Sequence, residues 1–228
     1  GDDSFGATAE KYFSTTKISS YTLIKDANAK TGNALVMVEN ATGNNSIVID
    51  LGANATITKA EILSDINNLQ SASVFLTQLE NNIEATKFAI EIAKKSGCYV
   101  ILNPAPYSDQ IVSHLPSIDL LIPNGTEAEL ISNIKIDSVI SAQEAIKAIH
   151  NLGVKEIVMT LGDSGALYFN GSTMKYYKAM NASVVDTSGA GDAFTGALAA
   201  KLIEGKNMDE AIKFSIAYAS LAVEKKGA

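Results

Sequence analysis

The segment 186–196 constrains this chain more than any other, because it places two glycines directly before an aspartate and an apolar helical pattern. Gly189 and Gly191 allow a tight backbone turn and leave the amides of Gly189, Ala190 and Gly191 uncovered by bulky side chains. The apolar spacing that follows predicts a helix over 192–204. Unpaired amides and the helix dipole together favour an anion at such a helix start. The loop therefore predicts an anion-binding site.

Asp192, which follows this loop directly, permits two interpretations. It could cap the predicted helix, a common role for aspartate. It could instead accept the proton of an attacking hydroxyl, while the loop amides stabilise charge that develops on a transferred group. The loop alone gives the two interpretations equal weight.

The sequence excludes two familiar phosphate-binding loops. A dinucleotide-binding turn needs a third glycine where Phe194 stands, and a P-loop needs Ser or Thr after Gly205-Lys206, where this chain has Asn207. A phosphate site on this chain would follow a different design.

Composition describes a globular chain with few ways to bind phosphate. Its 228 residues are 46% hydrophobic, which allows one large domain or two small ones with a substantial core. The net charge is −7 and all 18 basic residues are lysine, which argues against nucleic acid as a partner. Without arginine, phosphate charge must be met by backbone amides, lysine or a metal ion. No apolar run is long enough to cross a membrane, so we expect no membrane partner.

The remaining reactive residue types give no second site. Cys98 is the only cysteine, so no disulfide can form within the chain, and this fits a reducing, cytoplasmic location. His114 and His150 lie far apart and outside any metal-ligand spacing, so we expect ordinary helix or surface residues.

From Ser73 onward, apolar runs alternate with helical patterns. This alternation predicts an α/β fold with a parallel sheet covered by helices on both faces. The predicted strands span 73–79, 98–103, 119–124 and 156–162. The predicted helices span 82–95, 141–151, 192–204 and 208–225, and one more helix is expected to begin near Glu127. An edge hairpin joins 166–170 to 173–179.

The region 33–52 differs, because two apolar runs flank a turn-rich stretch, 40–46, with no helix between them. We interpret it as a small β-ribbon, which could be a lid, a dimer contact or an ordinary edge hairpin. The predicted organisation is then a truncated start of the α/β core over 1–32, the ribbon over 33–52 and an α/β nucleotide-binding core over 53–228.

Polar residues follow several of the predicted strands. Ligands of open parallel sheets bind at the carboxyl ends of the strands. Each of these residues alone has a structural explanation, such as capping by Asn124, but their shared location favours a site. They are Glu80, Asn103, Asn124 with Glu127, and Thr160 with Asp163, beside the glycine loop.

Taken together, the chain resembles the ribokinase-type carbohydrate kinases over its whole length. The Asp-Thr-x-Gly/Ala-Ala-Gly-Asp pattern in 186–192 is highly specific to that family. The other matching stretches, in family order, are 1–6, 51–55, 78–80, 103–106, 123–129 and 160–162. The resemblance implies a ribokinase-like fold with a small β-ribbon lid.

The resemblance also implies transfer of the ATP γ-phosphate to a sugar hydroxyl. The Gly-Ala-Asn-Ala and Asn-Pro-Ala-Pro runs point, less strongly, to ribose as the sugar, and the acceptor would then be the 5-hydroxyl of D-ribose. Asp192 would be the general base and would contact the sugar, with Gly189, Ala190 and Gly191 as the anion hole. Glu80 matches a residue that closes on the sugar.

Nucleotide and magnesium positions follow from the same resemblance. Asn124 and Glu127 match a motif that arranges Mg²⁺ around the phosphates, although Gly125 replaces a glutamate often seen between them. The nucleotide itself would contact Asn124, Thr160, Gly162, Asp163 and Gly191.

A monovalent cation is implied as well. Family members bind K⁺ beside the anion hole, where it orders the loop without entering the chemistry. Asp186 and Ser188, with the carbonyls of Ala222, Lys225 and Gly227, occupy the corresponding positions.

The chain departs from the family at both ends. The family's first strand, the first part of its lid and its Gly-Gly-Lys-Gly-Ala-Asn sugar motif do not occur in these 228 residues. The family segment that would follow Ala228, with a further potassium ligand, does not occur in them either. We therefore expect a largely intact nucleotide site, a mostly missing sugar site, poor folding and little sugar-kinase activity from this chain alone.

Three other functions stay open from the sequence. The chain could be another sugar or nucleoside kinase of the same fold, a non-catalytic nucleotide-binding protein, or a structural domain. A homodimer through the β-ribbon is a further expectation.

Overall fold

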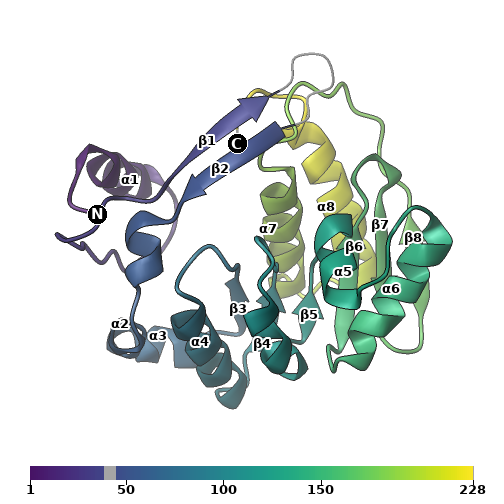
Figure 1. Ribbon diagram of the computed structural model, residues 1–228, viewed down its shortest axis with the longest axis horizontal. Coiled ribbons are helices and arrows are strands. Elements are labelled where there is room, and N and C mark those ends of the chain that lie inside the picture. The colour runs from purple at the N-terminus through teal and green to yellow at the C-terminus, as the bar shows by residue number, and fades with distance from the viewer. Residues whose placement is uncertain (39–44, 228) are drawn as a thin grey trace.

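Six strands form the central sheet of the computed structural model, which describes residues 1–38 and 45–227 (Figure 1). Their spatial order equals their order in the chain. The strands are β3 (Val74–Thr77), β4 (Tyr99–Leu102), β5 (Leu120–Leu121), β6 (Glu156–Thr160), β7 (Ala166–Phe169) and β8 (Met174–Tyr177).

Helices connect and flank these strands, and two short strands stand apart as a ribbon. The α-helices are α1 (Ser4–Thr15), α2 (Lys59–Ser64), α3 (Ile66–Ser71), α4 (Ile83–Lys95), α5 (Gly125–Ser132), α6 (Val139–Asn151), α7 (Ala190–Ile203) and α8 (Met208–Ala222). Three 3₁₀ helices are η1 (Gly52–Thr56), η2 (Asp109–Ser117) and η3 (Gly162–Ser164), and the ribbon consists of β1 (Asn33–Val38) and β2 (Asn45–Asp50).

Strands β3 to β6 are parallel, whereas β7 and β8 form an antiparallel hairpin at the sheet edge. Both features confirm the sequence prediction. Strand β5 is shorter than predicted, because Pro123 has no amide to donate to the ladder. Pairing resumes at Asn124, which forms a parallel bridge with Thr160.

Two buried clusters show that helices cover both faces of the sheet. One face packs Leu102, Ile157 and other strand residues against Ile90 of α4 and Ile146 of α6. The opposite face packs against α7 and α8. Strands that are covered on both faces must be apolar throughout, which is why they read as continuous apolar runs.

The amino ends of β4, β5 and β6 are tied together by Asp119. Its Oδ1 accepts from Lys94 at 2.5 Å and from Lys155 at 2.8 Å, and its Oδ2 accepts from the amide of Val100 at 2.9 Å. Burial disfavours ionisation of this carboxyl, but the hydrogen bonds from Lys155, Lys94 and Val100 outweigh it and hold the pKa of Asp119 below its usual range. The end of the sheet opposite the predicted site is thus fixed by charge-assisted bonds.

The β1–β2 ribbon is an antiparallel pair that runs from Asn33↔Asp50 to Val38↔Asn45, which confirms the predicted hairpin. Most of the predicted turn over 40–46 lies outside the described residues. The apolar side chains of the ribbon are unusually exposed: Leu35 is 63% exposed and its cross-strand partner Val48 is 61% exposed. An isolated two-stranded ribbon is only marginally stable, so the described residues leave this element without a packing partner on most of its surface.

Residues 1–32 contain one helix that the sequence analysis did not predict. Helix α1 begins after Asp3, whose Oδ1 accepts from the amide of Gly6 at 2.9 Å. The other oxygen of Asp3 accepts from the amide of Thr31 at 2.7 Å, which ties α1 to the segment before the ribbon. None of the side chains of α1 is buried, so apolar periodicity gave little signal there. Helices α2, α3 and η2 were also missed. Among the described residues, no helix combines the length and apolar character needed to span a membrane.

Candidate active site

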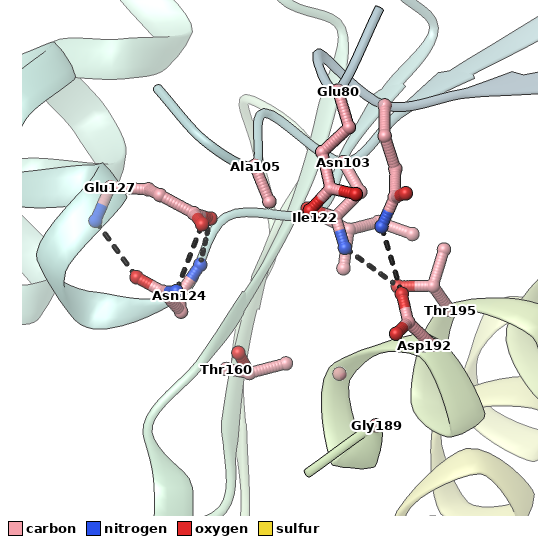
Figure 2. A pocket seen from close by; sticks show the side chains of 12 residues that line it. Glu80, Asn103, Ala105, Ile122, Asn124, Glu127, Thr160, Gly189, Asp192 and Thr195 are labelled. Atoms are coloured by element: carbon pink, nitrogen blue, oxygen red, sulfur yellow. Dashed lines mark hydrogen bonds between the residues drawn. The ribbon is translucent and has the colours of Figure 1, made fainter. Parts of the chain in front are cut away.

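A cavity of about 200 Å³ lies at the carboxyl edge of the parallel strands, against the start of α7 (Figure 2). Its lining comes from the ends of β3, β4, β5 and β6 and from the first turns of α5 and α7. The lining residues are Gln78, Glu80, Asn103, Ala105, Ile122, Asn124, Glu127, Thr160, Gly189, Gly191, Asp192 and Thr195. The structure therefore brings together most of the polar residues that the sequence analysis placed at strand ends.

Helix α7 begins at Ala190, two residues before the predicted start, and Gly189 is its N-cap with φ 72°. That backbone conformation suits glycine and strains other residues, which explains the glycine at this turn. The amide of Ala190 donates to the carbonyl of Thr187 at 3.2 Å, while Gly189 and Gly191 line the cavity. Of the three predicted anion-hole residues, Ala190 thus has its amide bonded within the loop.

Asp192 lies in the first turn of α7, exposed, and lines the cavity. The N-cap position belongs to Gly189, so Asp192 is not the capping residue of this helix. Its Oδ1 accepts a hydrogen bond from Gln78 Nε2 at 2.8 Å. Oδ2 is the other oxygen through which this carboxylate can accept a proton.

Glu80 lies at the exposed rim of the same cavity. Partial burial raises its pKa, and the nearby negative charge of Asp192 raises it further. The two carboxyl groups are therefore close enough to interact electrostatically.

Asn124 and Glu127 form a reciprocal capping box at the start of α5. Asn124 Oδ1 accepts from the Glu127 amide at 2.8 Å, and the Asn124 amide donates to Glu127 Oε2 at 2.8 Å. Asn124 Nδ2 also donates to Glu127 Oε1 at 2.9 Å. Burial raises the pKa of Glu127, and the amide hydrogen bond from Asn124 opposes it only in part. Both residues cap a helix and also line the cavity.

A second cavity of about 690 Å³ adjoins the first and shares Asn124, Thr160 and Gly191 with it. Gly162 and Asp163, two of the predicted nucleotide residues, also line it. The apolar wall of this cavity was not predicted, because its residues come from three separate segments and each resembles an ordinary core position in the sequence. That wall includes Ala179, Met180, Ile216, Ala219 and Val223.

The predicted cation residues also lie together, at the junction of the 186–191 loop and the end of α8. Asp186 is buried; its Oδ1 accepts from the Ser188 amide at 2.9 Å and its Oδ2 from the Gly227 amide at 3.0 Å. These amides lower the pKa of Asp186. The carbonyl of Ala222 accepts from the amide of Lys225 at 3.1 Å. Among the described residues, no group of three or more His, Cys, Asp or Glu side chains forms a metal-binding cluster.

Two contacts in the site had no sequence prediction. One is the bond from Gln78 to Asp192, and the other joins Asn103 Nδ2 to Thr195 Oγ1 at 3.3 Å. Asn103 had been placed at a strand end, but its partner lies 92 positions away, and no local pattern reveals such a pair.

Comparison with known proteins agrees with this geometry. The model of the pfkB family of carbohydrate kinases matches residues 1–228. The chain belongs to the pfkB family of carbohydrate kinases. This pfkB chain is therefore a phosphotransferase that acts on a hydroxyl group, and it is ribokinase-like in sequence and fold.

Similar pfkB proteins carry ribokinase names. A ribokinase of Haemophilus influenzae is 33% identical over all of this chain and 74% of its own length, and one of Staphylococcus aureus is 37% identical over 90% of this chain and 68% of its own. A deoxyribokinase of Salmonella typhi is 31% identical over all of this chain and 74% of its own length. The structure of Arabidopsis thaliana ribokinase complexed with ribose and ATP has a TM-score of 0.78 at 34% identity, and the match covers 88% of this chain and 65% of that one.

The buried carboxyl of Glu127 predicts a specific pH dependence of stability. Because its pKa is raised on folding, its contribution is fully present below the unfolded pKa of about 4.3 and is lost as pH rises through the folded pKa. Relative to Glu127→Gln, which does not titrate, the wild type should lose free energy of unfolding between pH 4 and pH 7. Urea denaturation at several pH values measures this difference. Glu144→Gln on the exposed face of α6 is the control, and a difference that grows in favour of the wild type as pH rises would contradict the prediction.

Proposed function

We propose that this kinase transfers the γ-phosphate of ATP to the 5-hydroxyl of D-ribose. The observation that carries the proposal is the convergence of Asp192, Gly189 and Gly191 with Asn124 and Glu127 on one small cavity that adjoins a larger one. Relatives named ribokinase, and a ribokinase solved with ribose and ATP, support the choice of substrates.

In this proposal the larger cavity binds the nucleotide and the smaller cavity contains the groups that act on the transferred phosphate. In the proposed complex, the apolar wall of the larger cavity holds the nucleotide base, and the γ-phosphate reaches the shared residues Asn124, Thr160 and Gly191. The amides at Gly189 and Gly191 then stabilise the charge on the transferred group.

Asp192 receives the proton. Gln78 holds Oδ1, so Oδ2 accepts the proton of the attacking hydroxyl. The hydroxyl oxygen forms its bond to the γ-phosphorus while the bond between that phosphorus and the leaving oxygen of ADP breaks. The transition state of phosphoryl transfer is loose, so the proton leaves late and the orientation of Asp192 matters more than its basicity.

The residues present fit a magnesium ion bound with the nucleotide. Mg²⁺ in kinases is commonly held by one or two carboxylates together with phosphate oxygens and water, rather than by a full protein cage. Glu127, with Asn124 beside it, would hold the ion and its waters. When bound, Mg²⁺ neutralises charge on the phosphates, which a chain without arginine needs.

We further propose a cytoplasmic location, which cell fractionation tests.

We also propose a K⁺ site at Asp186 and Ser188 with the carbonyls of Ala222, Lys225 and Gly227. The buried carboxylate of Asp186 lies beside the loop that carries the anion hole. Replacing K⁺ by tetramethylammonium at constant Mg²⁺ should lower kcat about tenfold or more, because the loop loses its ordering charge. A steady-state assay measures this, and equal rates in both salts would remove the K⁺ site.

The exposed ribbon supports a homodimer in which a second copy covers it. Converting the cross-strand pair Leu35 and Val48 to threonine keeps β-propensity but removes apolar area, so dimer affinity should fall about tenfold or more. Sedimentation velocity over a concentration series measures this, with Ile140→Thr as the control, since Ile140 is 70% exposed on α6. A wild type that stays monomeric throughout would refute the dimer.

Asp192→Asn decides the catalytic role. In the protein produced from its complete reading frame, this change should lower kcat with ribose roughly 10²–10⁴-fold, because the proton acceptor is lost. Binding of Mg·ATP should be unchanged. Coupled ADP-release kinetics and calorimetry measure the two effects, with Asp65→Asn between α2 and α3, outside the lining of both cavities, as the control. Equal rates for the Asp192 variant and the wild type would refute the role of Asp192.

The same assay tests substrate choice. Deoxyribose is the second candidate, because deoxyribokinases also match this chain. A clear preference for deoxyribose, fructose or adenosine over ribose would replace the proposed substrate.

A further inference from the structure

Asn103 lines the small cavity and carries a buried polar atom that the reaction described above does not use. Its side chain is 7% exposed and lines the small cavity. Nδ2 donates to Thr195 Oγ1 at 3.3 Å, but the buried Oδ1 has no hydrogen-bond partner. Among the described residues, the only other buried side-chain nitrogen or oxygen without a partner is Nδ1 of His150.

The backbone holds Asn103 firmly in this place. Its amide donates to the carbonyl of Thr77 at 3.0 Å, which continues the β3–β4 pairing beyond the strands. Two residues later, the carbonyl of Ala105 accepts from the amide of Leu79 at 2.9 Å. The carboxamide of Asn103 therefore lies beside the Gln78 segment and reaches Thr195, one turn after Asp192 on α7 (Figure 2).

A buried acceptor without a partner is costly in a folded protein. An apolar side chain at this position would not carry the desolvation cost of the unpaired oxygen. Leucine has nearly the shape of asparagine and contains no such oxygen. The asparagine is explained if a ligand supplies the missing donor.

We propose that Asn103 Oδ1 accepts a hydrogen bond from a hydroxyl of the bound sugar, and so helps to select the sugar. This inference rests on the proposed function. The attacking hydroxyl has one hydrogen, which goes to Asp192, so Asn103 receives a different hydroxyl of the same molecule. The sugar is favoured over the nucleotide because Asn103 follows β4, next to Gln78 and Glu80, while Asn124 and Glu127 satisfy each other on the phosphate side.

The test is Asn103→Leu in the protein produced from its complete reading frame. The KM for D-ribose and its calorimetric dissociation constant should rise roughly five- to twentyfold, as for the loss of one hydrogen bond. The KM for Mg·ATP should stay within about twofold. The melting temperature should change by no more than a few degrees, because the lost bond to Thr195 and the removal of the unpartnered acceptor act in opposite directions. A purely structural role for Asn103 predicts a clear loss of stability with unchanged ribose binding, and that result would overturn the proposal.

His150→Leu is the matched control. It removes the other unpartnered buried atom, at the end of α6 where the ring packs edge-on against Phe169 of β7, and His150 is absent from the lining of both cavities. Its kinetic constants should equal those of the wild type.

Sugar analogues locate the hydroxyl. Against 2-deoxyribose and 3-deoxyribose, the wild type should lose about tenfold in affinity for the analogue that lacks the recognised hydroxyl, and Asn103→Leu should not distinguish that analogue from ribose. Equal loss on every sugar, or a loss confined to the KM for Mg·ATP, would overturn the inference. If the wild type phosphorylates another sugar instead of ribose, the proposed substrate fails, and the same comparison with deoxy forms of that sugar still decides the role of Asn103.

Discussion

The common direction of β3, β4, β5 and β6 is the constraint on which the site depends. Parallel strands end at one edge of the sheet, so the residues that follow them converge there without any long loop. Helix α7 then packs across one face of the sheet with its first turn at that same edge. The chain thereby sets carboxylates and carboxamides against a helix start that favours negative charge.

Several residues serve the fold and the site together. Asn124 and Glu127 begin α5 and also line the cavity, and Asp186 fixes the glycine loop by accepting from Ser188 and Gly227. Glu127 and Asp186 are therefore acidic side chains whose carboxyl oxygens already accept hydrogen bonds from backbone amides. In a chain that has no arginine, this arrangement leaves amide groups and cations to compensate for phosphate.

Much of this structure could be read from the sequence where the signal was local. Continuous apolar runs predicted the buried strands, and the glycine loop predicted the start of α7 to within two residues. Helix α1 escaped prediction because it rests on the cap of Asp3 and not on an apolar stripe. The contacts Gln78–Asp192 and Asn103–Thr195 escaped because their partners are separated by 114 and 92 positions. Which polar atom is left without a partner depends on packing, and a sequence pattern does not contain that information.

The residues Asn124, Thr160 and Gly191 belong to both cavities, and this sharing limits how related enzymes can diverge. Under the proposed function, a replacement of one of these three shared residues would alter the recognition of both ligands at once. Freedom to diversify lies instead on the outer walls: Gln78, Glu80 and Asn103 on one side, and Met180 and Ile216 on the other. A scaffold of this kind can exchange its acceptor while it keeps its phosphate donor.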